Sequence, residues 1–301
     1  MEYKDFEELI ALAKEHPERK PVAIVGADDP HTLEAVVQAA KEGLIDPYLI
    51  GEAQKIRCIL SSMDYEVRGD RILNCVKPEQ AAFEGVRLVR EGKVRFLMKG
   101  LIETATLMKA ILNRETGIRT DRIISHVNFT SVQNYGKIFC VTDSAIVSNT
   151  DLAHKKDILQ NAVDAMRALG YDKPKVAVLC AVEKETAAMP ETIDAAELKQ
   201  MSLDGRITDC IVDGPISIDI AFDSEGAASV KGYSSDVVGK PDILVMPTLA
   251  AGNIFTKALR IFANSTSVGI VLGAKVPFVL LSRSTPVHSK YYSLVIASAM
   301  V

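Results

Sequence analysis

Short apolar runs alternate with longer segments of helical periodicity along most of the chain. Three segments combine a polar start with the i, i+3, i+4 apolar spacing of an amphipathic helix: His31–Glu42, Thr104–Asn113 and Asp151–Leu169. The runs that predict strands are Pro21–Val25, Pro47–Ile50, Val94–Met98, Tyr135–Val141, Lys175–Cys180, Cys210–Val212, Asp242–Met246 and Val276–Leu281. This alternation favours an α/β fold with a largely parallel sheet, because near-continuous Val, Ile and Leu runs suit strands covered on both faces.

The middle of the chain breaks this alternation. Two β-like runs, Ser125–Val132 and Tyr135–Val141, lie on either side of Gln133-Asn134. A short polar connection between two such runs is typical of a hairpin. We therefore predict a hairpin between two α/β halves and place a domain boundary in its turn.

Both predicted domains are α/β, and the first is discontinuous in sequence. The last segment, Pro286–Val301, is apolar on most sides of a helix, which is typical of a buried helix. A chain end that is buried in this way suggests a return to the first half of the chain. The first domain is therefore predicted to comprise residues 1–134 and 272–301, and the second residues 135–271.

Composition and charge narrow the function classes. The 301 residues include 35 Lys and Arg against 39 Asp and Glu, which gives a formal net charge of −4. Binding to nucleic-acid phosphates needs concentrated positive charge, so no nucleic-acid partner is expected. No apolar run approaches the roughly 20 residues of a membrane helix, and the acidic N-terminus is unlike a secretory signal. We expect a cytoplasmic protein with no membrane partner.

Several familiar motifs of metal, disulfide and nucleotide chemistry are missing from the sequence. The five cysteines never form C-x-x-C and the five histidines form no metal-spaced pair, so neither a disulfide framework nor a metal site is expected. The chain also lacks G-x-G-x-x-G, the phosphate-binding G-x-x-x-x-G-K-[ST] and the nucleophile elbow G-x-S-x-G. Hydride transfer and a hydrolase triad are therefore disfavoured.

Three predicted strands end in polar residues that suit an anionic ligand, and ligands of open α/β sheets bind beyond the carboxyl ends of strands. Lys99-Gly100 places a cation beside a residue that allows close backbone approach. A helix predicted to start near Asn253, with Lys257 one turn on, offers free backbone N–H groups. Ser282 and Arg283 follow another strand, and a guanidinium suits phosphate oxygens or an oxyanion. Each segment taken alone is also compatible with an ordinary turn, a packed connection or a surface Arg.

Taken in order, these segments resemble the phosphate acetyltransferase and phosphate butyryltransferase family. The matching motifs are Met98-Lys99-Gly100, Ile124-Ser125-His126-Val127, Asp213-Gly214-Pro215 with Asp219, the segment from Gly239 to Pro247, Ala251-Gly252-Asn253-Ile254, and Pro277 through Ser282-Arg283. They extend from roughly residue 95 to the C-terminus. Each motif alone is weak, whereas the ordered set is specific to the family.

The resemblance implies both an architecture and a reaction. The architecture would be two α/β domains with a ligand cleft between them, similar to that of isocitrate and isopropylmalate dehydrogenases, in a homodimer. The reaction would be reversible acyl transfer between coenzyme A and inorganic phosphate, with acyl-CoA and phosphate as substrates and no bound cofactor or metal. Direct attack of phosphate on the thioester needs mainly positioning and electrostatic stabilisation of the tetrahedral oxyanion.

The resemblance also implies roles for particular residues. Ser282 and Arg283 would stabilise the transition state and the leaving thiolate. Ser125 would contact the phosphoryl oxygens together with Lys99 and Gly100. Apart from the resemblance, the residue chemistry itself predicts that the helix start at Asn253, with Lys257, supplies further contacts to the anionic substrates, since both substrates carry phosphate groups.

One position departs from the acetyl-specific members of the family, in which an Asp seven residues after the motif Ser is the proposed base for the CoA thiol. Here the seventh residue after Ser282 is Ser289, and His288 stands beside it. Either His288 is the base, or solvent or the phosphate takes the proton, or the site is altered. This departure and the segments Ser282-Arg283-Ser284 and Gly269–Gly273 resemble the butyryl-type branch. We predict phosphate butyryltransferase activity, with phosphate acetyltransferase activity as the alternative.

Three other classes stay open. An acyltransferase that uses acyl carrier protein would need a basic docking patch, whereas Lys and Arg are scattered here. A metal- and NAD-dependent decarboxylating dehydrogenase would need clustered Asp residues and an Arg trio, which the sequence lacks. A homologue that binds CoA or acyl phosphate without turnover is compatible with the missing Asp.

Overall fold

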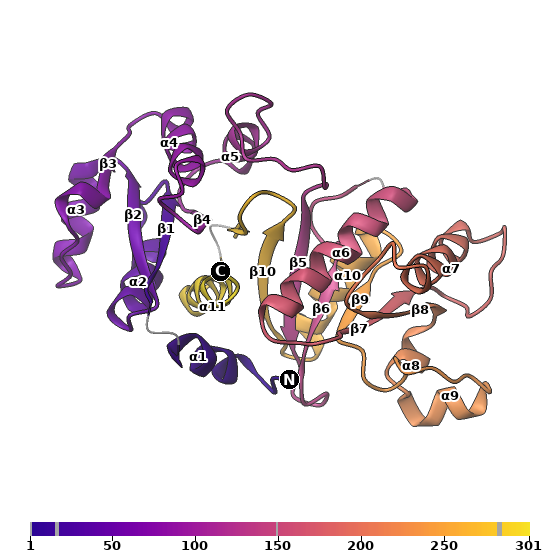
Figure 1. Cartoon of the computed structure of the whole chain (residues 1–301). Coiled ribbons are helices and arrows are strands. Elements are labelled where there is room, and N and C mark those ends of the chain that lie inside the picture. Colours follow the sequence, from indigo (N-terminus) through magenta and orange to yellow (C-terminus); the bar gives the residue numbers. More distant parts are fainter. Residues whose placement is uncertain (1, 16–17, 149, 282–284) are drawn as a thin grey trace. The chain divides into compact units, whose positions relative to one another are not determined.

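The protein is described by a computed structural model that covers residues 2–15, 18–148, 150–281 and 285–301 (Figure 1). Its internal contacts divide the chain into two compact units. The central unit comprises Met1–Asp5 and Ile123–Ser267, and the N-terminal unit comprises Phe6–Arg122 and Val268–Val301. The chain thus changes units just before the predicted hairpin, whereas the sequence-based boundary fell in the hairpin turn. Both hairpin strands stay in the central unit because the second of them pairs with another strand of that unit.

The N-terminal unit has a sheet in the order β3-β2-β1-β4-β11-β10. Its strands pair in parallel except for β10 and β11, which are antiparallel. The strands are β1 (Lys20–Val25), β2 (Ile45–Gly51), β3 (Ile72–Asn74), β4 (Phe96–Lys99), β10 (Thr266–Leu272) and β11 (Phe278–Val279), and β10 carries the chain back from the central unit. The helices are α1 (Phe6–Glu15), α2 (Pro30–Lys41), α3 (Ala53–Ser62), η1 (Gly69–Arg71), α4 (Pro78–Arg90), α5 (Thr104–Ile111) and α11 (Val287–Ala299).

The C-terminal helix α11 is buried, which confirms the expectation from its apolar pattern. It packs on α1 and α2 of the N-terminal unit. The Tyr291 hydroxyl donates to Glu42 over 2.6 Å, and the Tyr292 ring stacks on Phe6 at 5.3 Å between centroids. The start of α2 is fixed locally, because Asp29 accepts a hydrogen bond from the Thr32 backbone N–H. Helix α11 therefore belongs to the same core as the first strands.

The central unit has a sheet in the order β5-β6-β9-β7-β8. Strands β5 and β6 are antiparallel, which confirms the predicted hairpin, and the other pairs are parallel. The strands are β5 (Ser125–Ser131), β6 (Ile138–Thr142), β7 (Lys175–Leu179), β8 (Ile211–Ile216) and β9 (Ile243–Val245). The helices are α6 (Leu152–Ala168), α7 (Pro190–Leu203), α8 (Ile218–Ala221), η2 (Ser224–Gly226), α9 (Ala227–Val230) and α10 (Leu249–Phe262).

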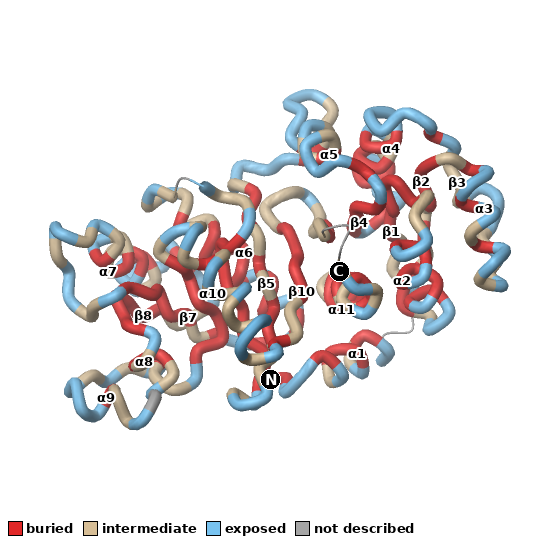
Figure 2. Tube along the Cα trace, turned by 180° about the vertical axis from the view of Figure 1, so that it is seen from behind, coloured by how far each residue is buried: buried red, intermediate tan, exposed pale blue. Residues whose placement is uncertain are grey.

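The strands of both units are largely buried, which is visible as red tube in Figure 2. In the central unit one such cluster contains Phe139, Val141, Ala177, Ile216 and Leu244. This confirms the α/β class predicted from uninterrupted apolar runs. No helix among the described residues is long and apolar enough to span a bilayer.

Candidate active site

The antiparallel strand β5 brings its first residues to the edge where the parallel strands of the central unit end. Asn128 pairs with Val141. Beyond this pair, His126, two residues before Asn128, donates its backbone N–H to Asp143, two residues after Val141. The helix that follows β9, α10, also begins at this edge. The topology of the hairpin therefore joins residues from three separate segments at the place where α/β folds bind ligands.

Asp143 organises the loop after β6. Its carboxylate is 3 % exposed and accepts three backbone hydrogen bonds, from Ala145 at 2.7 Å, Ile146 at 2.8 Å and His126 at 2.8 Å. A buried carboxylate is stable only with such donors. The carboxylate therefore ties the loop that starts at Ser144 to the first residues of β5.

His126 is half-buried and held from two sides. The Thr142 hydroxyl donates to its backbone carbonyl over 3.0 Å, and its ring Nδ1 lies 3.3 Å from the Ser144 hydroxyl. Burial lowers the pKa of the imidazole below its ordinary value of 6.5, against the opposing effect of the Asp143 carboxylate. The ring is therefore neutral at pH 7 and able to accept a proton.

Helix α10 begins at Leu249, four residues before the predicted start at Asn253. Its N-cap is Thr248, whose hydroxyl accepts from the Ala251 backbone N–H at 3.2 Å. A Cβ atom on Gly252 would lie 2.5 Å from the Asp143 carbonyl oxygen, so this glycine allows the helix to approach the loop after β6. The sequence predicts a later start because the first turn consists of Leu249 and small residues, which resemble a loop.

Asn253 joins the polar cluster through this close approach. Its side-chain amide donates to the Ser144 carbonyl over 3.1 Å. Lys257 lies one turn further along α10 and is exposed. The structure thus places Asn253 in contact with the loop that carries Asp143 and Ser144, and leaves the Lys257 ammonium in solvent.

Ser125 is adjacent to His126 in sequence but is fully buried. Its hydroxyl accepts a hydrogen bond from the side-chain amide of Asn161 over 2.9 Å, and that amide also donates to the Ile123 carbonyl. Since neighbouring residues of a strand point to opposite faces, Ser125 and His126 face different sides of β5. The structure therefore places Ser125 under helix α6 and His126 beside Ser144.

In the N-terminal unit, Lys99 ends β4 and is 7 % exposed. Its ammonium lies 3.4 Å from the carbonyl oxygens of Gly100 and Leu281. Any cation so deeply buried needs oxygen partners of this kind. The amine is therefore held at the end of the strand, next to the segment that leads to Ser282 and Arg283, which themselves lie outside the described residues.

Gly100 contacts the loop after β1 rather than open space. Its backbone N–H donates to Val25 over 2.8 Å, and the next N–H, of Leu101, donates to Gly26 over 2.7 Å. A Cβ atom on Gly100 would overlap the Gly26 carbonyl oxygen, and Gly26 itself has φ of 77°. The absence of a side chain at both positions allows these two loops to cross.

His288 lies in the first turn of α11 and is exposed. Its ring stands edge-on to Tyr292, 6.2 Å between centroids. It borders a cavity of about 230 Å³ whose other lining residues are Glu7, Ile10, Lys14, Gln38, Glu42, Tyr291 and Tyr292. The structure therefore groups His288 with α1 and α2, and with none of the other predicted site residues that it describes.

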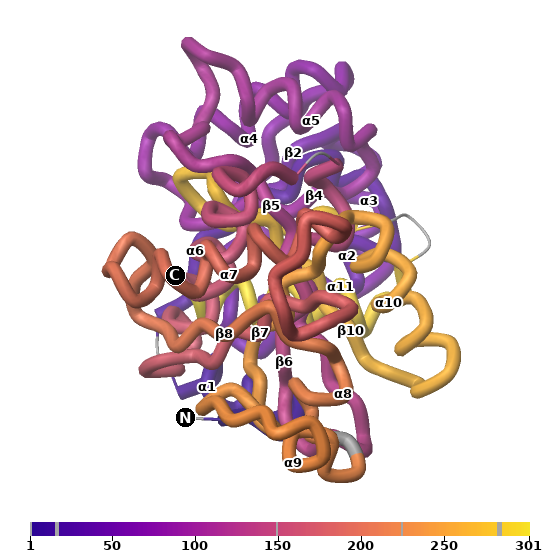
Figure 3. The backbone as a smooth tube through the Cα atoms, turned by 90° about the vertical axis from the view of Figure 1, so that its right-hand side faces the viewer, coloured from indigo at the N-terminus to yellow at the C-terminus, as the bar shows by residue number. Residues whose placement is uncertain are grey.

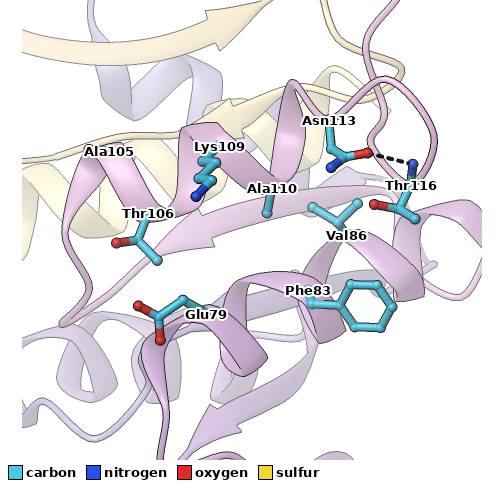
Figure 4. Close-up of a pocket in the computed structure, with 9 residues that line it drawn as sticks. All are labelled: Glu79, Phe83, Val86, Ala105, Thr106, Lys109, Ala110, Asn113 and Thr116. Atoms are coloured by element: carbon cyan, nitrogen blue, oxygen red, sulfur yellow. Dashed lines mark hydrogen bonds between the residues drawn. The ribbon is translucent and has the colours of Figure 1, made fainter.

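A larger groove of about 420 Å³ lies between α4 and α5 (Figure 4). Phe83, Val86 and Ala110 form its apolar side, and Glu79 and Thr106 lie together at one end. Asn113 accepts from the Thr116 backbone N–H at the other end. The groove contains none of the predicted site residues.

The described residues include no group of three His, Cys, Asp or Glu side chains that could hold a metal ion.

The sequence reasoning missed His126, Asp143 and Ser144 as members of one cluster. A usable signal was present, because Asp143 and Ser144 come two and three residues after the predicted strand Tyr135–Val141, much as Lys99 follows the strand that ends at Met98. What the sequence does not contain is the hairpin register that places His126 opposite them.

Comparison with known proteins identifies the class of protein. Residues 70–298 match the family described as phosphate acetyl/butaryl transferase, and the chain belongs to this family. It is 39 % identical to a phosphate butyryltransferase of Clostridium acetobutylicum, over 98 % of this chain and 97 % of that one. It is 41 % identical to a phosphate acetyltransferase of Rickettsia prowazekii, over 93 % of this chain and 80 % of that one. A branched-chain phosphotransacylase of Enterococcus faecalis is similar in structure, with a TM-score of 0.80, 33 % identity and coverage of 93 % and 98 %.

Proposed function

We propose that this protein catalyses reversible transfer of a butyryl group between coenzyme A and inorganic phosphate. The single observation that supports the reaction class is the family match over residues 70–298. The choice of butyryl is supported by Ser289 at the position where acetyl-type members have Asp, and by the near full-length match to a phosphate butyryltransferase. Acetyl transfer is the alternative, because relatives with that name are equally similar.

The proposed chemistry asks little of the protein beyond charge and position. Phosphate attacks the thioester carbonyl, an oxyanion develops, and the thiolate leaves. We assign stabilisation of these charges to Ser282 and Arg283, and phosphate contacts to Lys99, because fixed donors aimed at a developing oxyanion lower the barrier directly. No bound cofactor or metal takes part, and coenzyme A is a substrate.

The structure changes what we propose for the remaining predicted residues. Asn253 holds the loop at Ser144, so we propose that it positions backbone N–H groups for the substrate. Gly100 would act in the same indirect way, through its crossing with Gly26. Ser125 accepts from Asn161 and keeps its own O–H to donate, but it is fully buried, so its proposed contact with phosphoryl oxygens would require the hydroxyl to become accessible.

We propose in addition that the protein is a homodimer formed through helix α10. Helix α10 is the labelled yellow-orange helix at the right of Figure 3. Of its fourteen residues only Gly252 is buried, while Ile254, Ile261 and Phe262 are 69, 64 and 85 % exposed. Exposed apolar side chains gathered on one helix are typical of an interaction surface. Light scattering should give twice the chain mass for the wild type and the single-chain mass for Phe262→Glu. A monomeric wild type would contradict this assignment.

The test of the proposed reaction is phosphate-dependent release of free CoA, followed with a thiol reagent. Acetyl-, propionyl-, butyryl- and isobutyryl-CoA are compared at equal concentrations with and without phosphate. Release that needs phosphate and is fastest for butyryl-CoA supports the proposal. A maximum with acetyl-CoA would move the protein to the acetyl branch. No release from any substrate, in a protein that binds CoA, would identify a non-catalytic homologue.

A further inference from the structure

We propose that His126 is the catalytic base that removes the CoA thiol proton when acyl-CoA is formed and returns it in the reverse direction. This rests on the proposed acyl transfer between CoA and phosphate, but not on the length of the acyl chain. It addresses the need created by Ser289, which replaces the acidic residue expected at this point of the family motif. The sequence-based alternative for the same role was His288.

The geometry around His126 is that of a positioned imidazole. Its backbone N–H is bound by the Asp143 carboxylate and its carbonyl by the Thr142 hydroxyl. Its Nδ1 lies 3.3 Å from the Ser144 hydroxyl, and among the described residues no partner contacts Nε2. If Nδ1–H donates to Ser144, Nε2 carries the lone pair that a general base requires. These contacts hold His126 at the edge where the strands end and leave Nε2 without a hydrogen bond to the described residues.

The surroundings keep this imidazole neutral. The charged group that acts on the imidazole is Asp143 after β6. On the neighbouring helices, Asp157 of α6 accepts from the Ile123 backbone N–H, and Lys257 of α10 is exposed. Asp143 favours the protonated ring, but its carboxylate is already bound by three backbone N–H groups and burial dominates. A base that is neutral at pH 7 and stabilised when it takes a proton fits the task.

The proposed step balances in both directions. With acyl phosphate and CoA, Nε2 takes the S–H proton while the sulfur attacks the acyl carbon. The C–S bond forms, the C–O bond to phosphate breaks, and that electron pair leaves on the phosphate oxygen, which then receives the proton from the imidazolium. In reverse, Nε2 takes the proton of the attacking phosphate and gives it to the sulfur as the C–S bond breaks. No other reactant is needed.

His288 differs from His126 in each of these respects. It is exposed, and it packs against Tyr292 beside the polar cavity formed with α1 and α2. None of the residues around it in the described part of the chain comes from a strand end. The two histidines can therefore be separated by one experiment on the full-length protein.

The experiment compares the wild type with His126→Asn, because the Asn amide can keep the hydrogen bond to Ser144 while the group at Nε2 is lost. The rate of acyl-CoA formation from butyryl phosphate and CoA is measured from pH 6 to pH 9. We expect kcat to fall roughly hundredfold at pH 7, as for loss of a general base. The deficit should shrink by roughly tenfold by pH 9, because a free thiol ionises near about pH 8.5. The wild-type rate should be flat above pH 7.

Two further variants and three outcomes decide the assignment. Ser144→Ala should lower kcat without the new pH dependence, since it loosens the ring but keeps the base. The role of His126 is overturned, while the proposed function stands, if the rate deficit of His126→Asn does not change with pH. The same holds if the deficit that shrinks toward pH 9 is found in His288→Asn instead. A wild type with no turnover on any acyl phosphate would overturn the proposed function and this role with it. Circular dichroism and CoA binding show whether each variant is folded.

Discussion

The strand ends of the two units are built in opposite ways. In the central unit, polar side chains organise the edge, with Asp143 bound to three backbone N–H groups and Asn253 bound to the Ser144 carbonyl. In the N-terminal unit, backbone lies on backbone where Gly100 crosses Gly26, and the candidate functional group is the buried amine of Lys99. The first edge depends on hydrogen-bond partners, and the second depends on the absence of side-chain volume.

This difference predicts opposite sensitivities to mutation. Deleting a polar group should disturb the central unit, because buried polar atoms left without partners cost free energy. Adding a methyl group should disturb the N-terminal unit, because close-packed backbone has no space for it. It also divides the chemistry, with proton transfer proposed for the first edge and anion binding for the second.

The largest loss of activity is expected from removing the positive charge of Arg283. Arg283→Ala should lower kcat by about 100- to 1,000-fold, as for removal of one oxyanion donor. Arg283 is outside the described residues but follows Leu281, whose carbonyl lies by the Lys99 ammonium. The phosphate-dependent release of CoA measures the change, and Arg57→Ala on the exposed face of α3 is the matched control. Near-normal turnover in folded Arg283→Ala would remove this residue from the mechanism.

The next effect tests the backbone crossing. Gly100→Ala should lower the free energy of unfolding by about 3 kcal/mol, the upper range for overpacking, because the new Cβ overlaps the Gly26 carbonyl. Urea denaturation measures it. Gly69→Ala is the control, since no atom lies within 4 Å of the Cβ that it would introduce. Equal stability of the two variants would show that the loops separate easily and that the crossing is not a constraint.

Part of the fold could be predicted from the sequence, whereas the polar cluster could not. The apolar runs predicted most strands, because a strand covered on both faces leaves a local pattern. The run Thr266–Leu272 was missed as a strand. Helix α10 was placed four residues late, because the apolar and small residues Leu249 to Gly252, which follow the N-cap Thr248, were assigned to a loop. The polar cluster could not be assembled, since it depends on the pairing of Asn128 with Val141 across the hairpin. Gly100 was noticed for the correct property, but its neighbour in space is Gly26.

A smaller effect is expected from the carboxylate of the central unit. Asp143→Asn keeps an acceptor for Ala145 and Ile146 but turns an amide N–H₂ toward the His126 N–H. Two donors then face each other, so stability should fall by about 2 kcal/mol in urea unfolding. Loss of the negative charge should also lower the pKa of His126 further, which moves the acid limb of the rate profile to lower pH. An acid limb that moves to higher pH would contradict the electrostatic part of this argument.

The smallest loss of stability is expected from removing the hydrogen bond between helix α10 and the loop at Ser144. Asn253→Ala removes one hydrogen bond to the Ser144 carbonyl and should cost about 1 kcal/mol of unfolding free energy. Lys257→Ala, one turn further on and exposed, should change stability by less than about 0.5 kcal/mol. Because Gly252 still allows the close approach to Asp143, the helix should stay in place in both variants. A cost for Asn253→Ala as large as that for Asp143→Asn would mean that the helix, rather than the carboxylate, holds this loop.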